Sequence, residues 1–188
     1  MNWLIFGTAL FVSVHLVSAV VPSSVAALKS AVGEKPFRGV YSLLVLAGVV
    51  LIVVGWRSAV PVAVYAPPEF GPTLAFLLMF VSIFLFGASH AKTSLKRYVR
   101  HPQLTAVLLW SIAHLLSNGD IRSLVLFGSL GVWALVEMPL INHRDGEWEK
   151  PPRASMKSEL IGAAISVVVF LVLIALHPHF AGVSPLPG

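Results

Sequence analysis

Apolar residues are gathered in six long runs, which shorter polar or proline-containing stretches separate. The runs cover residues 2–21, 39–56, 71–88, 102–116, 121–141 and 159–176. An α-helix rises ~1.5 Å per residue, so roughly 20 apolar residues cross the ~30 Å hydrocarbon core of a membrane. The pattern therefore predicts an all-α, polytopic transmembrane helix bundle with about six spanning helices.

The stretches between the runs differ in kind. Residues 25–38 are amphipathic and are predicted to lie in the membrane interface. Residues 57–70 contain three prolines and cannot form a regular helix, and residues 142–158 are polar and charged. Within the fifth run, Gly128 and Gly131 are expected to allow close helix contact. We expect a single transmembrane domain over residues 1–188, with its core in 1–144 and a poorly ordered tail over 177–188.

Composition strengthens the membrane assignment. The chain is 57% hydrophobic and 11% charged, whereas soluble domains carry about 25% charged residues. It has no cysteine, so disulfides, zinc thiolates and thiolate-ligated iron are excluded. The first run lacks the basic leader of a cleavable signal peptide and is expected to be a retained first helix.

The Lys and Arg residues are distributed unevenly over the connections. Eleven of the 13 follow the first, third or fifth run, and only Arg57 and Arg122 follow the second or fourth. Short loops rich in Lys and Arg stay in the cytoplasm, so both termini are predicted on the non-cytoplasmic side of the membrane. The net charge of +5 is thus interpreted as a topology signal, and no nucleic-acid partner is expected.

The fourth run carries a narrow polar face. Gln103, Val107, Ser111, His114 and Asn118 follow the 3.6-residue helical repeat. Ionisable side chains inside a membrane are costly and mark a functional site by default. This face is therefore predicted to point into the bundle.

The seven histidines divide into two groups. His15 and His114 lie inside apolar runs, and the other five lie near run ends, where solvated imidazoles are ordinary. Of these five, His101 follows Arg100 and either binds an anion or simply begins a helix. Two buried imidazoles on different helices suit a b-type haem, since neutral nitrogen ligands hold iron without adding charge. The alternative is that each imidazole hydrogen bonds to a neighbouring helix.

Other side chains complete the candidate haem site. Zinc would need four tetrahedral ligands, usually including thiolates or carboxylates, and Glu137 is the only carboxylate placed inside a predicted span. Glu137 is expected to pair with Arg144 or to accept a hydrogen bond from a ligating histidine. The aromatic residues that could flank a macrocycle are Phe6, Phe11, Trp110 and Phe127.

Four stretches of the chain carry a resemblance to a known family. They read FVSVHLVSA (11–19), VGEKPFRGVYSLL (32–44), VGWR (54–57) and RHPQLTAVLLWSIAHLLSNGD (100–120), the last followed by SLVLFG. The sequence resembles the NnrU family of bacterial membrane proteins up to about Arg144. That family is named for a gene linked to nitrite and nitric-oxide reduction. It is similar to the plastid zeta-carotene cis–trans isomerase, whose membrane domain binds haem b through two histidines.

The resemblance implies His15 and His114 as axial iron ligands, with His101 as a further family histidine. It implies an inner-membrane haem b protein with redox or cis–trans isomerase chemistry on a lipophilic substrate such as a polyene. The alternative is a non-enzymatic haem protein that binds a diatomic ligand, or an assembly factor, supporting nitrite and nitric-oxide reduction. The expected cofactor-binding residues are His15, His114, His101, Arg100, Trp110, Ser111 and Asn118.

The axial pair has one rival. At ~1.5 Å per residue, His15 lies ~10 Å and His114 ~18 Å from the cytoplasmic surface, a mismatch that helix tilt could absorb. His15 with His101 would instead place the haem near the cytoplasmic boundary. We favour His114, because burial without a partner costs more there and the resemblance points the same way.

Overall fold

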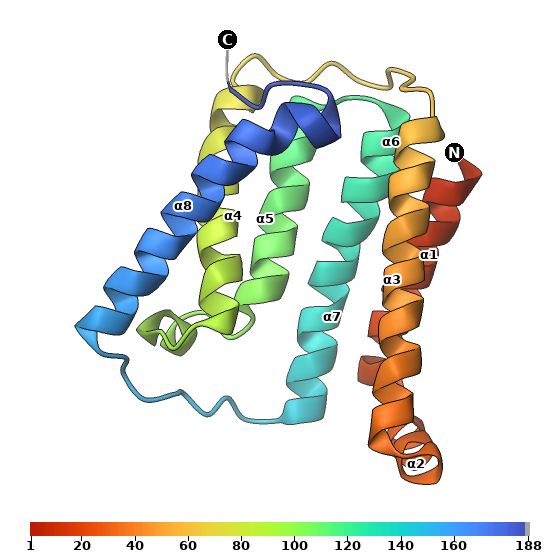
Figure 1. Cartoon of the computed structure of the whole chain (residues 1–188), viewed down its shortest axis with the longest axis vertical. Helices are drawn as coiled ribbons and strands as arrows, with labels where there is room; N and C mark the ends of the chain where they lie inside the picture. The colour runs from red at the N-terminus through yellow and green to blue at the C-terminus, as the bar shows by residue number, and fades with distance from the viewer. Residues whose placement is uncertain (187–188) are drawn as a thin grey trace. The chain divides into compact units, whose positions relative to one another are not determined.

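The computed structural model describes residues 1–186, and over that range the chain is helical apart from its connections (Figure 1). The β-structure within residues 1–186 is one isolated antiparallel bridge between Ala63 and Asp120. The helices are α1 (Asn2–Val20), α2 (Pro22–Val32), α3 (Glu34–Ser58), α4 (Gly71–His90), η1 (Ser94–Arg97), α5 (Pro102–Ser117), α6 (Ile121–Ser123), η2 (Leu124–Gly128), α7 (Ser129–Asp145) and α8 (Met156–Ala181).

The predicted fold class is confirmed. Among the described residues, five helices are long and apolar enough to cross a membrane: α1, α3, α4, the continuous helix Ile121–Asp145 and α8. Helix α5 is a shorter apolar helix of 16 residues. The chain is therefore a multi-pass, all-helical membrane protein, and about six spans remain consistent with its helices.

Two helix boundaries differ from the predicted ones. Helix α3 begins at Glu34, so part of the predicted interfacial stretch belongs to a spanning helix, where Arg38 pairs with Glu34 one turn away at 2.7 Å. Helix α8 continues through Pro178 and ends at Gly182, whose φ of 79° gives a left-handed cap. Residues 177–181 of the predicted disordered tail are thus helical, and residues 187–188 lie outside the described part.

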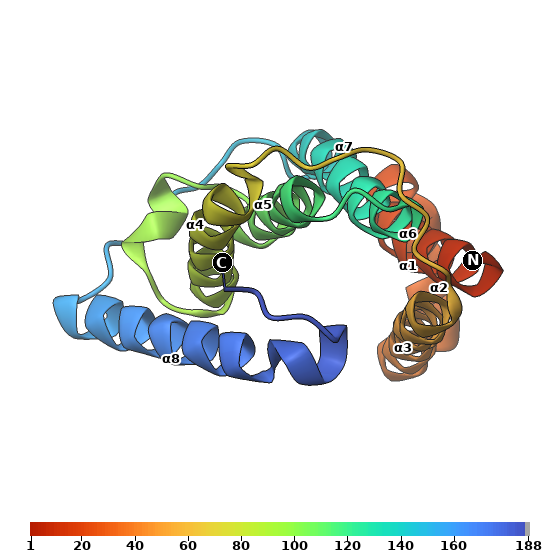
Figure 2. The same ribbon diagram turned by 90° about the horizontal axis from the view of Figure 1, so that it is seen from above.

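The chain divides into two compact units. Unit 1 comprises Met1–Tyr65 and Asp120–Gly146, and unit 2 comprises Ala66–Gly119 and Glu147–Gly188. The helices of each unit can be followed in Figures 1 and 2 by their labels. The single-domain organisation stays a prediction.

In unit 1, the backbones of α1 and α3 lie close together. A Cβ built on Gly7 of α1 would lie 2.6 Å from the Ile52 nitrogen, and one on Gly55 of α3 would overlap the Leu4 backbone. Glycine removes the side chains that would hold the helices apart, as is common where membrane helices pack. This contact fixes α1, which carries His15, against α3.

The last helix of unit 1, Ile121–Asp145, begins at a side-chain cap. The Asp120 carboxylate accepts hydrogen bonds from the Arg122 and Ser123 backbone nitrogens and from the Ser123 hydroxyl. The Arg122 guanidinium also lies 4.4 Å from the centre of the Trp56 ring, a cation–π contact with α3. Burial, and then the Asp120 charge, raise the pKa of the nearby Tyr65 hydroxyl.

Unit 2 is built on α4, which packs against both α5 and α8. The buried Ser82 hydroxyl of α4 donates a hydrogen bond to the Ala106 carbonyl of α5 at 2.8 Å. On the α8 side, the Phe170 ring lies edge-on against Phe76 and Phe80, with centroids 5.2 and 5.3 Å away. The contact with α4 holds α5, the helix with the polar face, in place within unit 2.

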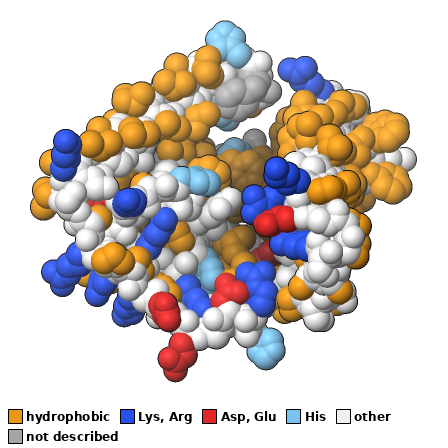
Figure 3. Space-filling view, turned by 60° about the horizontal axis from the view of Figure 1, so that its bottom comes forward, with side chains coloured by type: hydrophobic (Ala, Val, Ile, Leu, Met, Phe, Trp, Pro, Cys, Tyr) orange, Lys and Arg blue, Asp and Glu red, His pale blue; other side chains and the backbone are white. Residues whose placement is uncertain are grey.

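Two basic connections of unit 2 are hydrogen bonded to each other. Arg97 of η1 donates to the Pro151 carbonyl at 2.5 Å, and the Ser158 hydroxyl donates to the Lys92 carbonyl at 2.6 Å. Glu159 accepts from the Thr93 hydroxyl. The cations of both connections thus gather at one end of unit 2, and many of the chain's Lys and Arg side chains can be seen in Figure 3.

Candidate functional site

His15 is held from two sides in the last turns of α1. Its Nδ1 lies 2.7 Å from the Phe11 carbonyl oxygen one turn earlier. A carbonyl oxygen only accepts, so in the neutral imidazole the proton lies on Nδ1 and the lone pair on Nε2. A neutral imidazole with a free Nε2 lone pair is the form that ligates a metal, and anchoring of the other nitrogen is usual for such ligands.

Three aromatic rings from three helices of unit 1 surround the His15 imidazole. The ring centroids of Phe11, Trp133 and Tyr41 lie 4.3, 5.1 and 5.8 Å from that of His15. Trp133 is buried, and its indole Nε1 donates a hydrogen bond to the buried Glu137 carboxylate. The imidazole is therefore oriented by packing as well as by its own hydrogen bond.

His114 repeats the local arrangement of His15 on α5. Its Nδ1 lies 2.8 Å from the Trp110 carbonyl oxygen, and the Trp110 ring centroid lies 4.9 Å from that of the imidazole. The Asn118 side chain donates to the His114 carbonyl at 2.9 Å, which stabilises the end of the helix. Because the Trp110 carbonyl can only accept, the neutral imidazole of His114 has its proton on Nδ1 and its basic lone pair on Nε2.

His15 and His114, the two ligands predicted from the sequence, thus share one local arrangement. In each, an imidazole is fixed to the carbonyl of an aromatic residue four positions earlier, whose ring also contacts it. The His90 ring contacts that of Phe86, and the His177 Nδ1 pairs with the Val183 carbonyl near the end of the chain. The shared geometry favours His15 and His114 as ligands over these two.

Ser111 is a buried polar residue one helical turn before His114. Its hydroxyl has no hydrogen-bond partner among the described residues, and its exposed fraction is 1%. A buried hydroxyl without a partner costs about 1–3 kcal/mol. A polar group of a bound cofactor would offset this cost, so Ser111 fits the predicted cofactor-binding set.

Arg100 and His101 lie just before α5, where His101 precedes the first helical residue, Pro102. The His101 carbonyl accepts from the Thr105 hydroxyl, a helix-start contact. This is consistent with the simpler interpretation of His101 as the residue that begins the helix. Contact of Arg100 with a carboxylate ligand stays a prediction.

His15 belongs to unit 1 and His114 to unit 2. Within residues 1–186, no three His, Asp or Glu side chains gather into a metal-ion site. Haem requires less of the protein, because the macrocycle supplies four ligands and the chain only the axial ones. Ligation of one haem iron by His15 and His114 stays a prediction.

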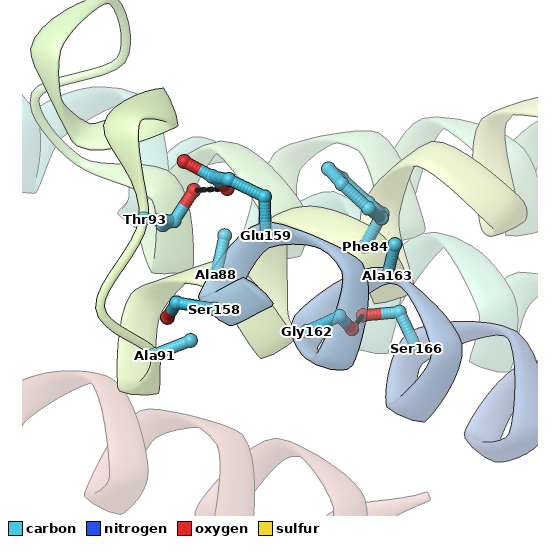
Figure 4. A pocket seen from close by; sticks show the side chains of 9 residues that line it. All are labelled: Phe84, Ala88, Ala91, Thr93, Ser158, Glu159, Gly162, Ala163 and Ser166. Atoms are coloured by element: carbon cyan, nitrogen blue, oxygen red, sulfur yellow. Dashed lines mark hydrogen bonds between the residues drawn. The ribbon is translucent and has the colours of Figure 1, made fainter. Parts of the chain in front are cut away.

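A small cavity of unit 2 does not serve this purpose. It has a volume of about 20 Å³, room for about one water molecule. The residues that line it are Phe84, Ala88, Ala91, Thr93, Ser158, Glu159, Gly162, Ala163 and Ser166, and Figure 4 shows Glu159 turned to the Thr93 hydroxyl. The cavity is a packing feature between α4 and α8.

Two contacts of His15 were not predicted from the sequence. Tyr41 could be placed near it only once α1 and α3 were packed. Trp133 and Glu137 are four residues apart on one helix, a spacing that indicates a possible side-chain pair. The predicted ion pair of Glu137 with Arg144 is wrong, because the Arg144 Nε bonds to Asp145 at 2.7 Å.

A family model described as NnrU protein matches residues 3–185, nearly the whole chain. No curated protein and no solved structure matches the sequence.

Proposed function

Because this chain belongs to the NnrU family of proteins, we propose that it is a haem b-binding protein of the bacterial inner membrane, with His15 and His114 as the axial ligands. The observation that carries the proposal is the local arrangement that both histidines share. Each has Nδ1 at hydrogen-bond distance from a backbone carbonyl, at 2.7 and 2.8 Å, so Nε2 is the nitrogen that carries the lone pair in the neutral imidazole. Each lies in an apolar helix, as a haem-binding imidazole of a membrane bundle does.

The chain's own residues would bind and orient the cofactor. Phe11 and Trp110 fix the imidazole planes, and Ser111 offers a hydroxyl to a polar group of the macrocycle. Arg100 is the proposed partner of a propionate, since charge-assisted contacts to carboxylates are strong. When bound, haem b supplies an iron that exchanges electrons and takes an outside ligand if one axial bond is labile. We propose redox or cis–trans isomerase chemistry on a lipophilic substrate.

The direct test is the haem content of the protein purified in mild detergent. We expect one b-type haem per chain by pyridine haemochrome analysis. A protein that copurifies without haem and does not take up added haemin would contradict the proposal. That result would leave the alternative role in assembly of the nitrite and nitric-oxide reduction machinery.

The proposed topology has a separate test. A reporter fused at Lys96 or Lys150 should report the cytoplasm, and one at Arg57 or the C-terminus should report the periplasm. The reason is the bias of eleven basic residues to two between alternate connections. A cytoplasmic C-terminus would remove the six-span arrangement.

A further inference from the structure

Glu137 is a buried acidic residue inside an apolar helix. Its exposed fraction is 6%, and it lies two turns from the end of α7. Burying a carboxylate in a membrane helix is costly, and such residues tend to have a partner and a role. Its hydrogen-bond donor is the Trp133 indole, one turn earlier.

Trp133 connects Glu137 to His15. The indole and imidazole centroids lie 5.1 Å apart with the rings inclined at 65°, and the indole also meets Phe11 edge-on at 5.6 Å. An indole can turn about its side-chain bonds, but a hydrogen bond at Nε1 selects one orientation. The carboxylate of Glu137 therefore determines which edge of the indole His15 contacts.

Two other polar side chains lie near the Glu137 carboxylate, those of Tyr41 and Arg144. Tyr41 and Arg144 both interact electrostatically with the Glu137 carboxylate. Arg144 is bonded to Asp145 and to the Ser18 carbonyl, and the Tyr41 ring lies against His15. Among the described residues, the group seen to donate a hydrogen bond to the Glu137 carboxylate is the Trp133 indole.

We propose that Glu137 is a positioning residue for His15, acting through the Trp133 indole. Its carboxylate holds the indole, and the indole with Phe11 and Tyr41 holds the plane of the imidazole. Where His15 ligates haem, this sets the orientation of the axial ligand; that part of the inference rests on the proposed function. The hydrogen-bonded arrangement itself does not.

The test compares Glu137→Leu, Glu137→Gln and Trp133→Phe in the full-length protein. Removing partners that orient a metal ligand typically costs about 10–100-fold in affinity. We therefore expect Glu137→Leu and Trp133→Phe each to weaken haem retention about tenfold and to broaden the low-spin electron paramagnetic resonance signal. Glu137→Gln should behave like the wild type, because its amide oxygen still accepts from the indole.

Thr8→Val is the matched control. Thr8 is buried on the same helix as His15, and its hydroxyl bonds only to the Leu4 carbonyl at 2.8 Å. Its substitution perturbs packing without touching the imidazole, so it should leave the spectrum unchanged. The double variant of Glu137→Leu and Trp133→Phe should be no worse than either single variant, since both remove the same hydrogen bond.

Nuclear magnetic resonance of the haem-free protein separates this inference from the proposed function. The Trp133 indole proton should resonate downfield, and Glu137→Leu should shift it and the His15 ring nitrogens together, whereas Glu137→Gln should not. Unchanged His15 resonances in Glu137→Leu would overturn the positioning role even if haem binds. Equal losses in Glu137→Gln and Glu137→Leu would also overturn it, because charge rather than position would then be responsible.

Discussion

Replacing His15 or His114 with alanine is expected to abolish low-spin haem binding. Loss of a partner that only orients a metal ligand costs about 10–100-fold in affinity, so loss of the ligand itself should cost at least about 100-fold. The measurement is the absorption and electron paramagnetic resonance spectrum of each variant after purification. Exogenous imidazole should restore part of the low-spin signal in both variants, because it can occupy the position that the side chain leaves.

His101→Ala is the matched control for these two substitutions. His101 directly precedes α5, and its carbonyl accepts a hydrogen bond from the Thr105 hydroxyl, which the substitution retains. The variant should therefore keep the low-spin spectrum. Loss of that spectrum in His101→Ala, with retention in His114→Ala, would reverse the assignment and place the haem near the cytoplasmic boundary.

Replacing Gly55 with alanine should strongly destabilise unit 1. The added methyl group would overlap the backbone of Leu4, which has an exposed fraction of 0%, and backbone cannot move aside as a flexible side chain can. Overpacking typically costs about 1–3 kcal/mol, and this site should lie at or above the upper end. Thermal unfolding of the purified protein, followed by tryptophan fluorescence, gives the effect.

Gly39→Ala is the control on the same helix. A Cβ at Gly39 meets nothing within 4 Å, and alanine is favoured over glycine in a helix by about 0.5–1 kcal/mol. This variant should be at least as stable as the wild type. If Gly55→Ala unfolded at the wild-type temperature, the close approach of α1 and α3 would be refuted.

The spans could be predicted from the sequence because each is a long apolar run, and hydropathy depends on composition rather than on contacts. The ends of the helices were harder to predict. Helix α8 passes His177 and Pro178 because an apolar helix tolerates proline and stops where Gly182 provides a left-handed cap. The helix start at Glu34 was missed because charged residues at an interface give no apolar signal.

Helix packing was the least predictable part. Gly128 was expected to allow close contact, yet a Cβ there meets nothing within 4 Å, whereas Gly7 and Gly55 make the contacts. A glycine in an apolar run has the same local signal in either case, and only the partner helix distinguishes them. The division into two units, with His15 and His114 in different ones, likewise leaves no mark on the hydrophobic pattern.

The candidate site was partly predictable for a related reason. His15 and His114 could be identified because a titratable side chain in an apolar run is conspicuous. Their anchoring to the carbonyls of Phe11 and Trp110 follows from helical spacing and is seen in the structure. The contact of Trp133 with His15 joins residues more than 100 positions apart, and no periodicity in the sequence indicates it.

The most direct test of the central claim is the reduced-minus-oxidised absorption spectrum of the purified wild-type protein. Ligation by His15 and His114 predicts a Soret band that shifts on reduction and sharp α and β bands of a six-coordinate, low-spin b-type haem. Carbon monoxide should shift the reduced spectrum if one axial bond is labile, as chemistry at the iron requires. A spectrum without a Soret band, before and after addition of haemin, would contradict the claim.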